Sequence, residues 1–280
     1  MLTHPDPKTA ARMRAAHTRA RAALHATATS DPDEMWGWRG RTLSRPVTTA
    51  HGPAWLRLAC APTDRIVATF WNGVVDAEQA MPTTLPRPKL RDLHDWNHGS
   101  WSYRAELYDR ASSPAASKTA VLTHEPDLPP SWWDGLRRAL HTISRVRTHR
   151  RTAFQPFLDH AMPRYLGAPV DTVAPSWSTA HGDLHFANLG APALILFDWE
   201  GWGVAPTGYD AAMLHSYSLL VPSAAARIRK ELAHILDTPA GRFAELVTIT
   251  ELLHLTVRSE ETELRTPLLR RASHLLERAR

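Results

Sequence analysis

One segment of the chain joins regularly spaced polar residues to an apolar run, and it constrains the fold more than any other feature. It runs from residues 181–188 (HGDLHFAN) through residues 193–197 (ALILF) to a carboxylate, Asp198. The apolar run predicts a buried strand that ends at Asp198. Asp183, Asn188 and Asp198 all carry oxygen donors, which suit Mg²⁺ better than zinc. The segment therefore predicts a magnesium site at the mouth of a core.

These three oxygen-bearing side chains are the set that phosphoryl transfer requires. One carboxylate accepts the hydroxyl proton, and an amide with a second carboxylate holds the magnesium ions that bridge the phosphates. A zinc hydrolase is the alternative, because His181, Asp183 and His185 alternate and would share one face of a strand. Zinc would leave Asn188 and Asp198 without a role, so the segment favours phosphoryl transfer.

The rest of the chain predicts a small β-rich part followed by a larger helical part. Its 280 residues, 43% of them apolar, are enough for two modest lobes. We predict an α+β protein with an N-terminal helical extension (1–30), a small β-rich lobe (31–110) and a helical lobe (111–280) that carries the site. Apolar patterning and turn residues predict strands over 42–49, 55–60, 88–96 and 101–108, and helices over 8–28, 66–80, 132–143, 153–166, 209–220, 223–236, 239–258 and 266–280.

Charge and cysteine content exclude several classes of function. The formal net charge is +5, but the basic residues are scattered and nearly all are arginine. The densest group, residues 145–151, lacks interleaved aromatic residues, so we expect no nucleic-acid partner. Cys60 is the single cysteine, which excludes an intrachain disulfide. Without a signal-like or membrane-spanning apolar stretch, the sequence predicts a cytoplasmic protein with no membrane association, and it does not indicate an oligomeric state.

The polar segment resembles the catalytic loop of the aminoglycoside phosphotransferase and choline kinase family. The resemblance extends through residues 198–200 (DWE), which are similar to the metal-binding segment of that family. It continues through residues 201–212 (GWGVAPTGYDAA), which are similar to its Gly/Pro-rich run and the start of the next helix. The close match covers about thirty residues, and the order of β-rich and helical parts agrees with the family across most of the chain. The resemblance implies a two-lobed, protein-kinase-like fold.

The resemblance also implies a role for each polar residue of the segment. Asp183 is expected to act as the base, and Asn188 and Asp198 as ligands of Mg²⁺. Asp210 is expected to brace the catalytic loop, and His181 to anchor its backbone. The implied cofactors are ATP and Mg²⁺, although the residues do not distinguish ATP from GTP. The implied reaction transfers the γ-phosphate to a hydroxyl of a small molecule or biosynthetic intermediate, so the expected partners are a nucleotide and that acceptor.

The β-rich part departs from the family pattern. The family carries a lysine on the third strand of the small lobe, paired with a glutamate of the following helix. The strand candidate 55–60 has Arg57 and no lysine, and the glycines before it are isolated. Arg57 is therefore the candidate nucleotide-binding cation, with Glu78 or Asp76 as its helix partner, and an outward-facing strand residue is the alternative. This departure leaves a second hypothesis open, a catalytically weak, kinase-like nucleotide-binding or regulatory protein.

Overall fold

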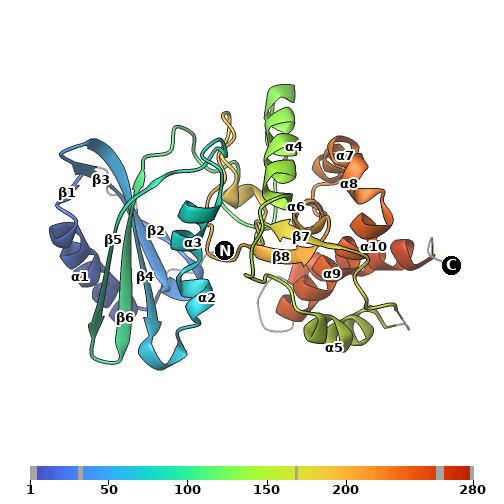
Figure 1. Ribbon diagram of the computed structural model, residues 1–280, viewed down its shortest axis with the longest axis horizontal. Coiled ribbons are helices and arrows are strands. Elements are labelled where there is room, and N and C mark those ends of the chain that lie inside the picture. Colours follow the sequence, from blue (N-terminus) through green and yellow to red (C-terminus); the bar gives the residue numbers. More distant parts are fainter. Residues whose placement is uncertain (1–4, 31–33, 168–169, 257–261, 278–280) are drawn as a thin grey trace. The chain divides into compact units, whose positions relative to one another are not determined.

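The structure is a computed structural model, and it describes residues 5–30, 34–167, 170–256 and 262–277. The chain folds into two compact units (Figure 1). The first unit contains an antiparallel sheet, and the second is mainly helical. The predicted α+β class, with a β-rich N-terminal part and a helical C-terminal part, is confirmed. The first unit comprises Met1–Gln79 and Arg87–Ser112, and the second comprises Ala80–Pro86 and Ser113–Arg280.

The sheet of the first unit is antiparallel throughout, with strand order β1-β3-β4-β6-β5 and with β2 paired on β3. Two-residue turns close both hairpins, and Gly52 and Gly99 beside or within these turns have positive φ angles of 94° and 60°. The strands predicted over 42–49, 55–60, 88–96 and 101–108 are confirmed as two hairpins, with ends shifted by at most three residues. The strands are β1 (Thr27–Ala28), β2 (Met35–Trp36), β3 (Thr42–Thr49), β4 (Gly52–Pro62), β5 (Leu90–His98) and β6 (Trp101–Asp109).

Helix α1 (Pro7–Ala23) covers one face of this sheet. The Asp6 side chain caps the helix by accepting from the amides of Lys8 and Thr9. Met13 of α1 belongs to the same fully buried cluster as Leu56 and Leu58 of β4. Because side chains alternate along a strand, Arg57 lies on the opposite face, with Glu106 and Arg104 of β6. One face of the sheet is therefore apolar, and the other holds charged pairs.

The helix predicted over 66–80 is interrupted. The structure has α2 (Ala68–Trp71) and α3 (Gly73–Ala80), with Asn72 ending the first helix. Asn and Gly are poor helix formers, so the Asn72-Gly73 pair explains the break. Arg104 adds to it by donating to the carbonyl of Trp71 and to the Asn72 Oδ1 atom, 3.3 Å away.

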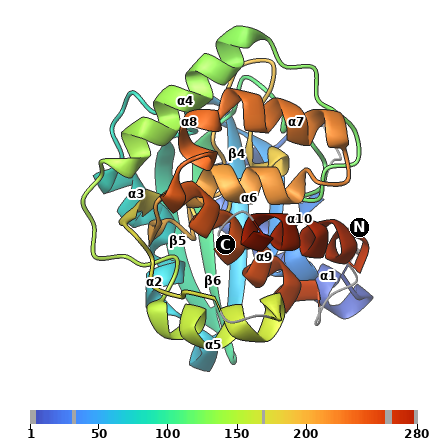
Figure 2. The ribbon, with the colours of Figure 1, turned by 90° about the vertical axis from the view of Figure 1, so that its right-hand side faces the viewer.

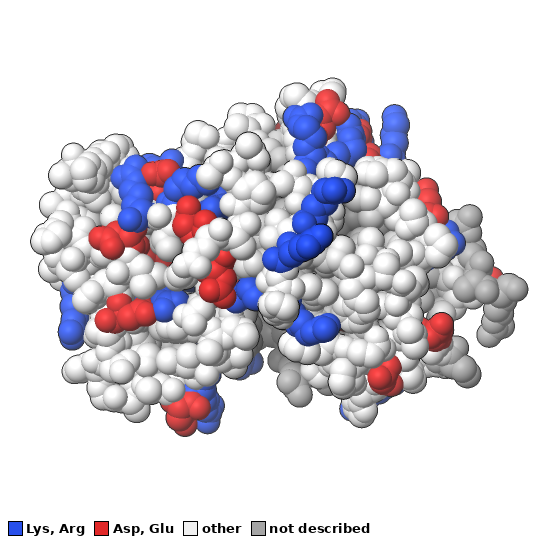
Figure 3. All heavy atoms as spheres, in the orientation of Figure 1, with Lys and Arg blue, Asp and Glu red and all other residues white. Residues whose placement is uncertain are grey.

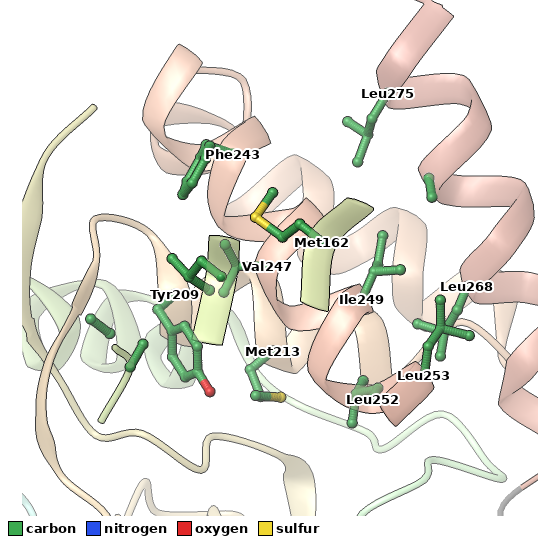
Figure 4. Close-up of a cluster of buried hydrophobic side chains, with 14 of the residues drawn as sticks. Met162, Tyr209, Met213, Phe243, Val247, Ile249, Leu252, Leu253, Leu268 and Leu275 are labelled. Carbon is green, nitrogen blue, oxygen red and sulfur yellow. The ribbon is translucent and has the colours of Figure 1, made fainter. Parts of the chain in front are cut away.

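In the second unit, helices α5, α6, α8 and α10 pack against α9 (Figure 2). Helix α9 is apolar on several sides, and Figure 4 shows its residues Phe243, Val247 and Leu253 within one buried cluster. The predicted helix 223–236 is split at Leu232, and the predicted ends at 258 and 280 lie outside the described residues. The elements are α4 (Pro130–Ser144), α5 (Gln155–Leu166), β7 (Trp177–Ala180), β8 (Gly203–Pro206), α6 (Tyr209–Tyr217), α7 (Pro222–Glu231), α8 (Ala233–Leu236), α9 (Pro239–Thr256) and α10 (Arg265–Glu277).

Four short 3₁₀ turns complete the described secondary structure: η1 (Trp38–Gly40), η2 (Thr63–Arg65), η3 (Phe186–Asn188) and η4 (Thr262–Leu264).

On the face drawn in Figure 3, acidic and basic side chains lie among one another rather than in one basic block. Across the described ranges, every helix is too short or too polar to cross a lipid bilayer.

A buried carboxylate ties four helices of the second unit together. Glu245 of α9 is fully buried and accepts from Arg271 of α10 at 2.8 Å and from Arg229 of α7 at 3.1 Å. His215 of α6 lies 3.0 Å from the same carboxylate. Burial raises the pKa of Glu245, but the contacts with His215 and Arg271 prevail and lower it to about 2. This ionised group fixes α6, which carries part of the candidate site.

Candidate active site

The polar segment begins where strand β7 ends and the backbone turns sharply. Gly182 has a φ angle of +89°, and a β-carbon there would lie 2.5 Å from the carbonyl oxygen of Gly201. Only glycine tolerates both the conformation and the close approach. The His181-Gly182-Asp183 sequence therefore reflects a backbone requirement, which directs Asp183 away from the end of the strand.

Asp210, in the first turn of α6, stabilises the backbone turn at His181 and Gly182. Its carboxylate accepts from the amide of His181 at 2.7 Å and from the amide of Gly182 at 3.0 Å. Asp210 is 7% exposed, and burial raises its pKa despite the nearby His181 and the two amide bonds. Two otherwise unsatisfied amides thus depend on one side chain that lies about thirty residues further along the chain.

His181 connects the same turn to the segment that precedes Asp198. The His181 ring is fully buried, and its Nε2 atom lies 2.7 Å from the carbonyl oxygen of Phe197. The ring also meets Trp199 edge to face, with centroids 4.7 Å apart. Burial lowers the pKa of His181, which favours a neutral imidazole that donates from Nε2.

Asp183 lies at the exposed side of the turn and has two polar neighbours. Its side chain is 47% exposed, and its Oδ2 atom accepts from Asn188 Nδ2 at 3.1 Å and lies 3.5 Å from His185 Nε2. Desolvation would raise the pKa of Asp183, but the contacts with His185, His181 and Asn188 prevail and lower it. Asp183 is therefore ionised at neutral pH and can accept a proton.

A narrow hairpin brings Asp198 to the same end of the unit as Asn188. The Phe197 amide donates to the carbonyl of Asn188 at 2.9 Å, and the Gly190 amide donates to the carbonyl of Ile195 at 2.7 Å. The Asn188 side chain is mostly buried, and its Nδ2 atom also donates to the carbonyl oxygen of Asp183 at 2.9 Å. The hairpin therefore joins the segments of Asp183, Asn188 and Asp198.

The predicted buried strand over 193–197 is wrong. The run forms one arm of the hairpin, with a single bridge between Leu189 and Leu196, and its first residue, Ala193, is exposed. Asp198 is also exposed and has a φ angle of +57°, which is uncommon for a residue other than glycine. Five apolar residues are too few for periodicity to distinguish a buried strand from a hairpin arm.

Comparison with solved structures identifies the fold of the chain. No protein-family model matches the chain, and no curated protein matches it in sequence. Among solved structures, a microcompartment-associated aminopropanol kinase aligns over 93% of this chain and 95% of its own, with a TM-score of 0.54 and 12% identity. The chain has a protein-kinase-like fold. The fold implied by the resemblance of residues 181–212 is thereby confirmed.

Two further structures are similar at lower scores. A Ralstonia eutropha JMP134 protein with the provisional name aminoglycoside phosphotransferase is 14% identical, covers 92% of this chain and 95% of its own, and has a TM-score of 0.49. An ethanolamine kinase of Plasmodium vivax is 11% identical, covers 87% of this chain and 81% of its own, and has a TM-score of 0.42. At 12% identity, the likeness to the aminopropanol kinase shows the fold alone and leaves the reaction to be argued from the site.

In this kinase-like chain, Arg57 contacts the neighbouring strand β6. Its Nη1 atom donates to Glu106 Oε2 on the neighbouring strand at 3.0 Å, and the Tyr108 hydroxyl donates to the same oxygen at 2.9 Å. The Arg57 side chain is only 14% exposed, so the outward-facing alternative is wrong. Glu78 of α3 pairs with Arg87. A nucleotide-binding role for Arg57 stays a prediction.

The donor set fits magnesium better than zinc. Asp183, Asn188 and Asp198 present carboxylate and amide oxygens, the ligands that a hard cation prefers. Within the described ranges, no three His, Cys, Asp or Glu side chains gather into a metal-binding group. In addition, His181 Nε2 is occupied by the Phe197 carbonyl, which removes it from the alternating set that suggested zinc.

The sequence interpretation missed the residue that clamps the segment after Asp198. Arg150 donates to the carbonyl of Glu200 and to the carbonyl of Trp202, both at 3.0 Å, and its guanidinium lies 5.0 Å from the Trp202 ring. Thr152 donates to the carbonyl of Gly201 at 2.7 Å. The sequence indicates no structural role for residues 145–151, because nothing in it pairs Arg150 with carbonyls fifty residues away.

The contacts of Asp210 generate a stability prediction. Asp210→Ala leaves the amides of His181 and Gly182 without an acceptor, and each such buried amide costs about 1–3 kcal/mol. We expect a lower melting temperature without any ligand, and faster hydrogen exchange at those two amides. Asp134→Ala, at an exposed carboxylate on α4, is the control and should melt like the parent. Unchanged exchange at both amides in Asp210→Ala would show that another group holds the turn.

Proposed function

We propose that this protein transfers the γ-phosphate of ATP to a hydroxyl group of a small molecule. The observation that carries the proposal is the contact of 3.1 Å between Asn188 Nδ2 and the ionised Asp183, within a hairpin that also delivers Asp198. A base and two magnesium ligands are the groups that this reaction takes from a protein. The kinase-like fold supports the same class of reaction by analogy.

Each residue of the site then has a distinct task. Asp183 orients the acceptor hydroxyl and takes its proton, for which its carboxylate is available because it is ionised and its side chain is exposed. Asn188 and Asp198 would hold Mg²⁺, and bound magnesium supplies positive charge beside the phosphates. Asp210 and His181 keep the turn in place through their backbone contacts. A reaction that consumes ATP would place the protein in the cytoplasm, as the sequence predicts.

The acceptor is proposed to be a small amino alcohol. A pocket of about 390 Å³ in the second unit contains Glu125, Asp127, Trp133 and Phe186, and Phe186 lies between Asp183 and Asn188 in the sequence. Carboxylates beside aromatic rings favour a cationic amine. The basic residue of the pocket, Arg227, is paired with Glu231 at 2.9 Å, so the two carboxylates of the pocket are left for a ligand. The similarity to an aminopropanol kinase supports this acceptor class.

A catalytically weak, kinase-like regulatory protein is the second candidate. The commitment of Arg57 to Glu106 and Tyr108 favours it, because that contact occupies the cation expected to reach the nucleotide. Such a protein would bind ATP and would transfer little or no phosphate to any amino alcohol or diol. Coupled measurement of ADP release across a panel of acceptors distinguishes the two candidates.

Replacing the proposed base tests the reaction directly. Asp183→Asn keeps the size of the side chain and its contact with Asn188 but removes the group that accepts the proton. We expect turnover to fall by a factor of about 10²–10⁴ while ATP affinity is retained. Steady-state turnover and ATP titration on the same preparation check this. Turnover near that of the parent would exclude Asp183 as the base.

Replacing Asp198 tests the magnesium site. Because Asp198 is exposed, Asp198→Ala should fold like the parent and should lose the magnesium-dependent part of its ATP affinity. Titrations of ATP with Mg²⁺ and with EDTA measure that part. Asp171→Ala, at another exposed carboxylate of the same unit, is the matched control and should keep it. Full magnesium-dependent binding by Asp198→Ala would mean that the metal is held elsewhere.

The proposed acceptor class predicts a selective change in KM. Asp127→Asn combined with Glu125→Gln removes the negative charge of the pocket without changing its volume. We expect the KM for 1-amino-2-propanol to rise by about 3- to 10-fold with little change in kcat, since an ion contact at an exposed site contributes about 1 kcal/mol. The KM for 1,2-propanediol should not change. Equal effects on both acceptors would contradict recognition of the amine.

A further inference from the structure

The first unit contains a buried basic cluster that the proposed reaction does not use. It consists of Arg87 and Lys89, on the segment that leads into β5, and Glu78 on helix α3. Pro86 and Pro88 flank Arg87, and a residue before proline is held in an extended conformation. In an extended chain, residues two apart point to the same side. The Pro-Arg-Pro-Lys sequence therefore directs both cations to one place.

The donors of this cluster are not all satisfied. The Arg87 side chain is 4% exposed, and its Nη1 atom donates to Glu78 Oε2. Its Nε and Nη2 atoms, and the Nζ atom of Lys89, are shielded from solvent and have no hydrogen-bond partner among the residues that the structure describes. Buried polar groups in folded proteins are almost always paired, so these three nitrogen atoms indicate a missing acceptor.

The charges of the cluster do not balance either. Glu78 Oε2 also accepts from the amide of Leu90 at 3.2 Å, so this carboxylate already accepts from a guanidinium and an amide, and Lys89 adds a second positive charge nearby. Burial raises the pKa of Glu78, but Arg87, the Leu90 amide and the charge of Lys89 prevail and lower it. Glu78 is thus ionised, and the cluster retains an excess of one positive charge.

A second buried arginine of the same unit, Arg104, has acceptors for its donors. The Arg104 side chain is 6% exposed, and each of its three nitrogen atoms donates to an acceptor. Its Nε and Nη2 atoms reach the two oxygens of Asp95 at 2.8 and 2.6 Å, and its Nη1 atom reaches the carbonyl of Trp71. The fold therefore supplies a full set of acceptors to a buried guanidinium where no ligand is needed.

We propose that Arg87 and Lys89 form a binding site for a phosphate group. A phosphate presents several acceptor oxygens and more than one negative charge, which matches the planar fork of Arg87 and the compact charge of Lys89. A metal cation would be repelled by the same excess charge. The Glu78 side chain is 29% exposed and Lys89 is partly exposed, so the cluster borders solvent.

The phosphate could belong to a nucleotide or to a separate phosphorylated or inorganic ligand, and competition distinguishes these sources. The full chain is titrated with inorganic phosphate in chloride buffer, alone and with saturating ATP. Phosphate binding that ATP displaces identifies a nucleotide phosphate, and phosphate binding that survives ATP identifies a separate phosphate ligand. Both results support the site, whereas no binding of phosphate or ATP by the parent chain would overturn it.

Lys89→Met is the deciding variant, because it removes one donor and leaves the Arg87–Glu78 pair intact. We expect the dissociation constant for phosphate to rise roughly tenfold, as for the loss of one charge-assisted hydrogen bond. Lys118→Met, at an exposed lysine, is the matched control and should bind like the parent. Equal affinity of Lys89→Met and the parent would overturn the proposal.

The phosphate site can fail or hold independently of the proposed reaction. Asp183→Asn should bind phosphate like the parent, because Asp183 belongs to the other unit. Normal phosphate binding with no transfer activity would therefore preserve the site and remove the reaction, and the opposite pattern would remove the site alone.

Discussion

The two hydrogen bonds from the amides of His181 and Gly182 to the carboxylate of Asp210 hold the candidate site together. Gly182 has a positive φ angle, so its turn cannot belong to a regular strand and needs an acceptor from elsewhere. Helix α6 supplies that acceptor from its first turn, where the partial positive charge of the helix favours a carboxylate. The position of Asp183 depends on this contact, because Asp183 follows directly after the two amides.

Helix α6 can serve as a support because the second unit fixes it at both ends. The Tyr209 hydroxyl at its start donates to Glu251 of α9, and burial raises the pKa of that carboxyl to about 7. His215 near its end lies 3.0 Å from the buried Glu245, which also binds arginines of α7 and α10. A carboxylate that braces a loop must itself be rigid, and buried polar contacts to α9 provide that rigidity.

Arginine side chains stabilise both units through hydrogen bonds and ion pairs, so the high arginine content has a structural role. Arg150 donates hydrogen bonds to the carbonyls of Glu200 and Trp202, which follow the proposed metal ligand Asp198. These bonds hold a segment that lies outside any helix or strand. Arg57 forms a cross-strand pair with Glu106, which a planar, always-charged group can do in a largely buried position. Arg87 is different, because its donors exceed the acceptors that the described residues provide. Composition alone could not separate these roles.

The sequence by itself determined the α+β class, the two hairpins and the residues gathered in the site, because these depend on local periodicity, turn residues and a long spaced motif. Local pattern was insufficient for the break at Asn72-Gly73 and for the 193–197 run, which became a hairpin arm with an exposed Asp198. Local sequence pattern also could not predict which groups pair with Arg57, Arg87 and Arg150. Only the tertiary structure decided those, because a charged side chain pairs with whatever acceptor the packing brings near it, and that acceptor can lie anywhere along the chain.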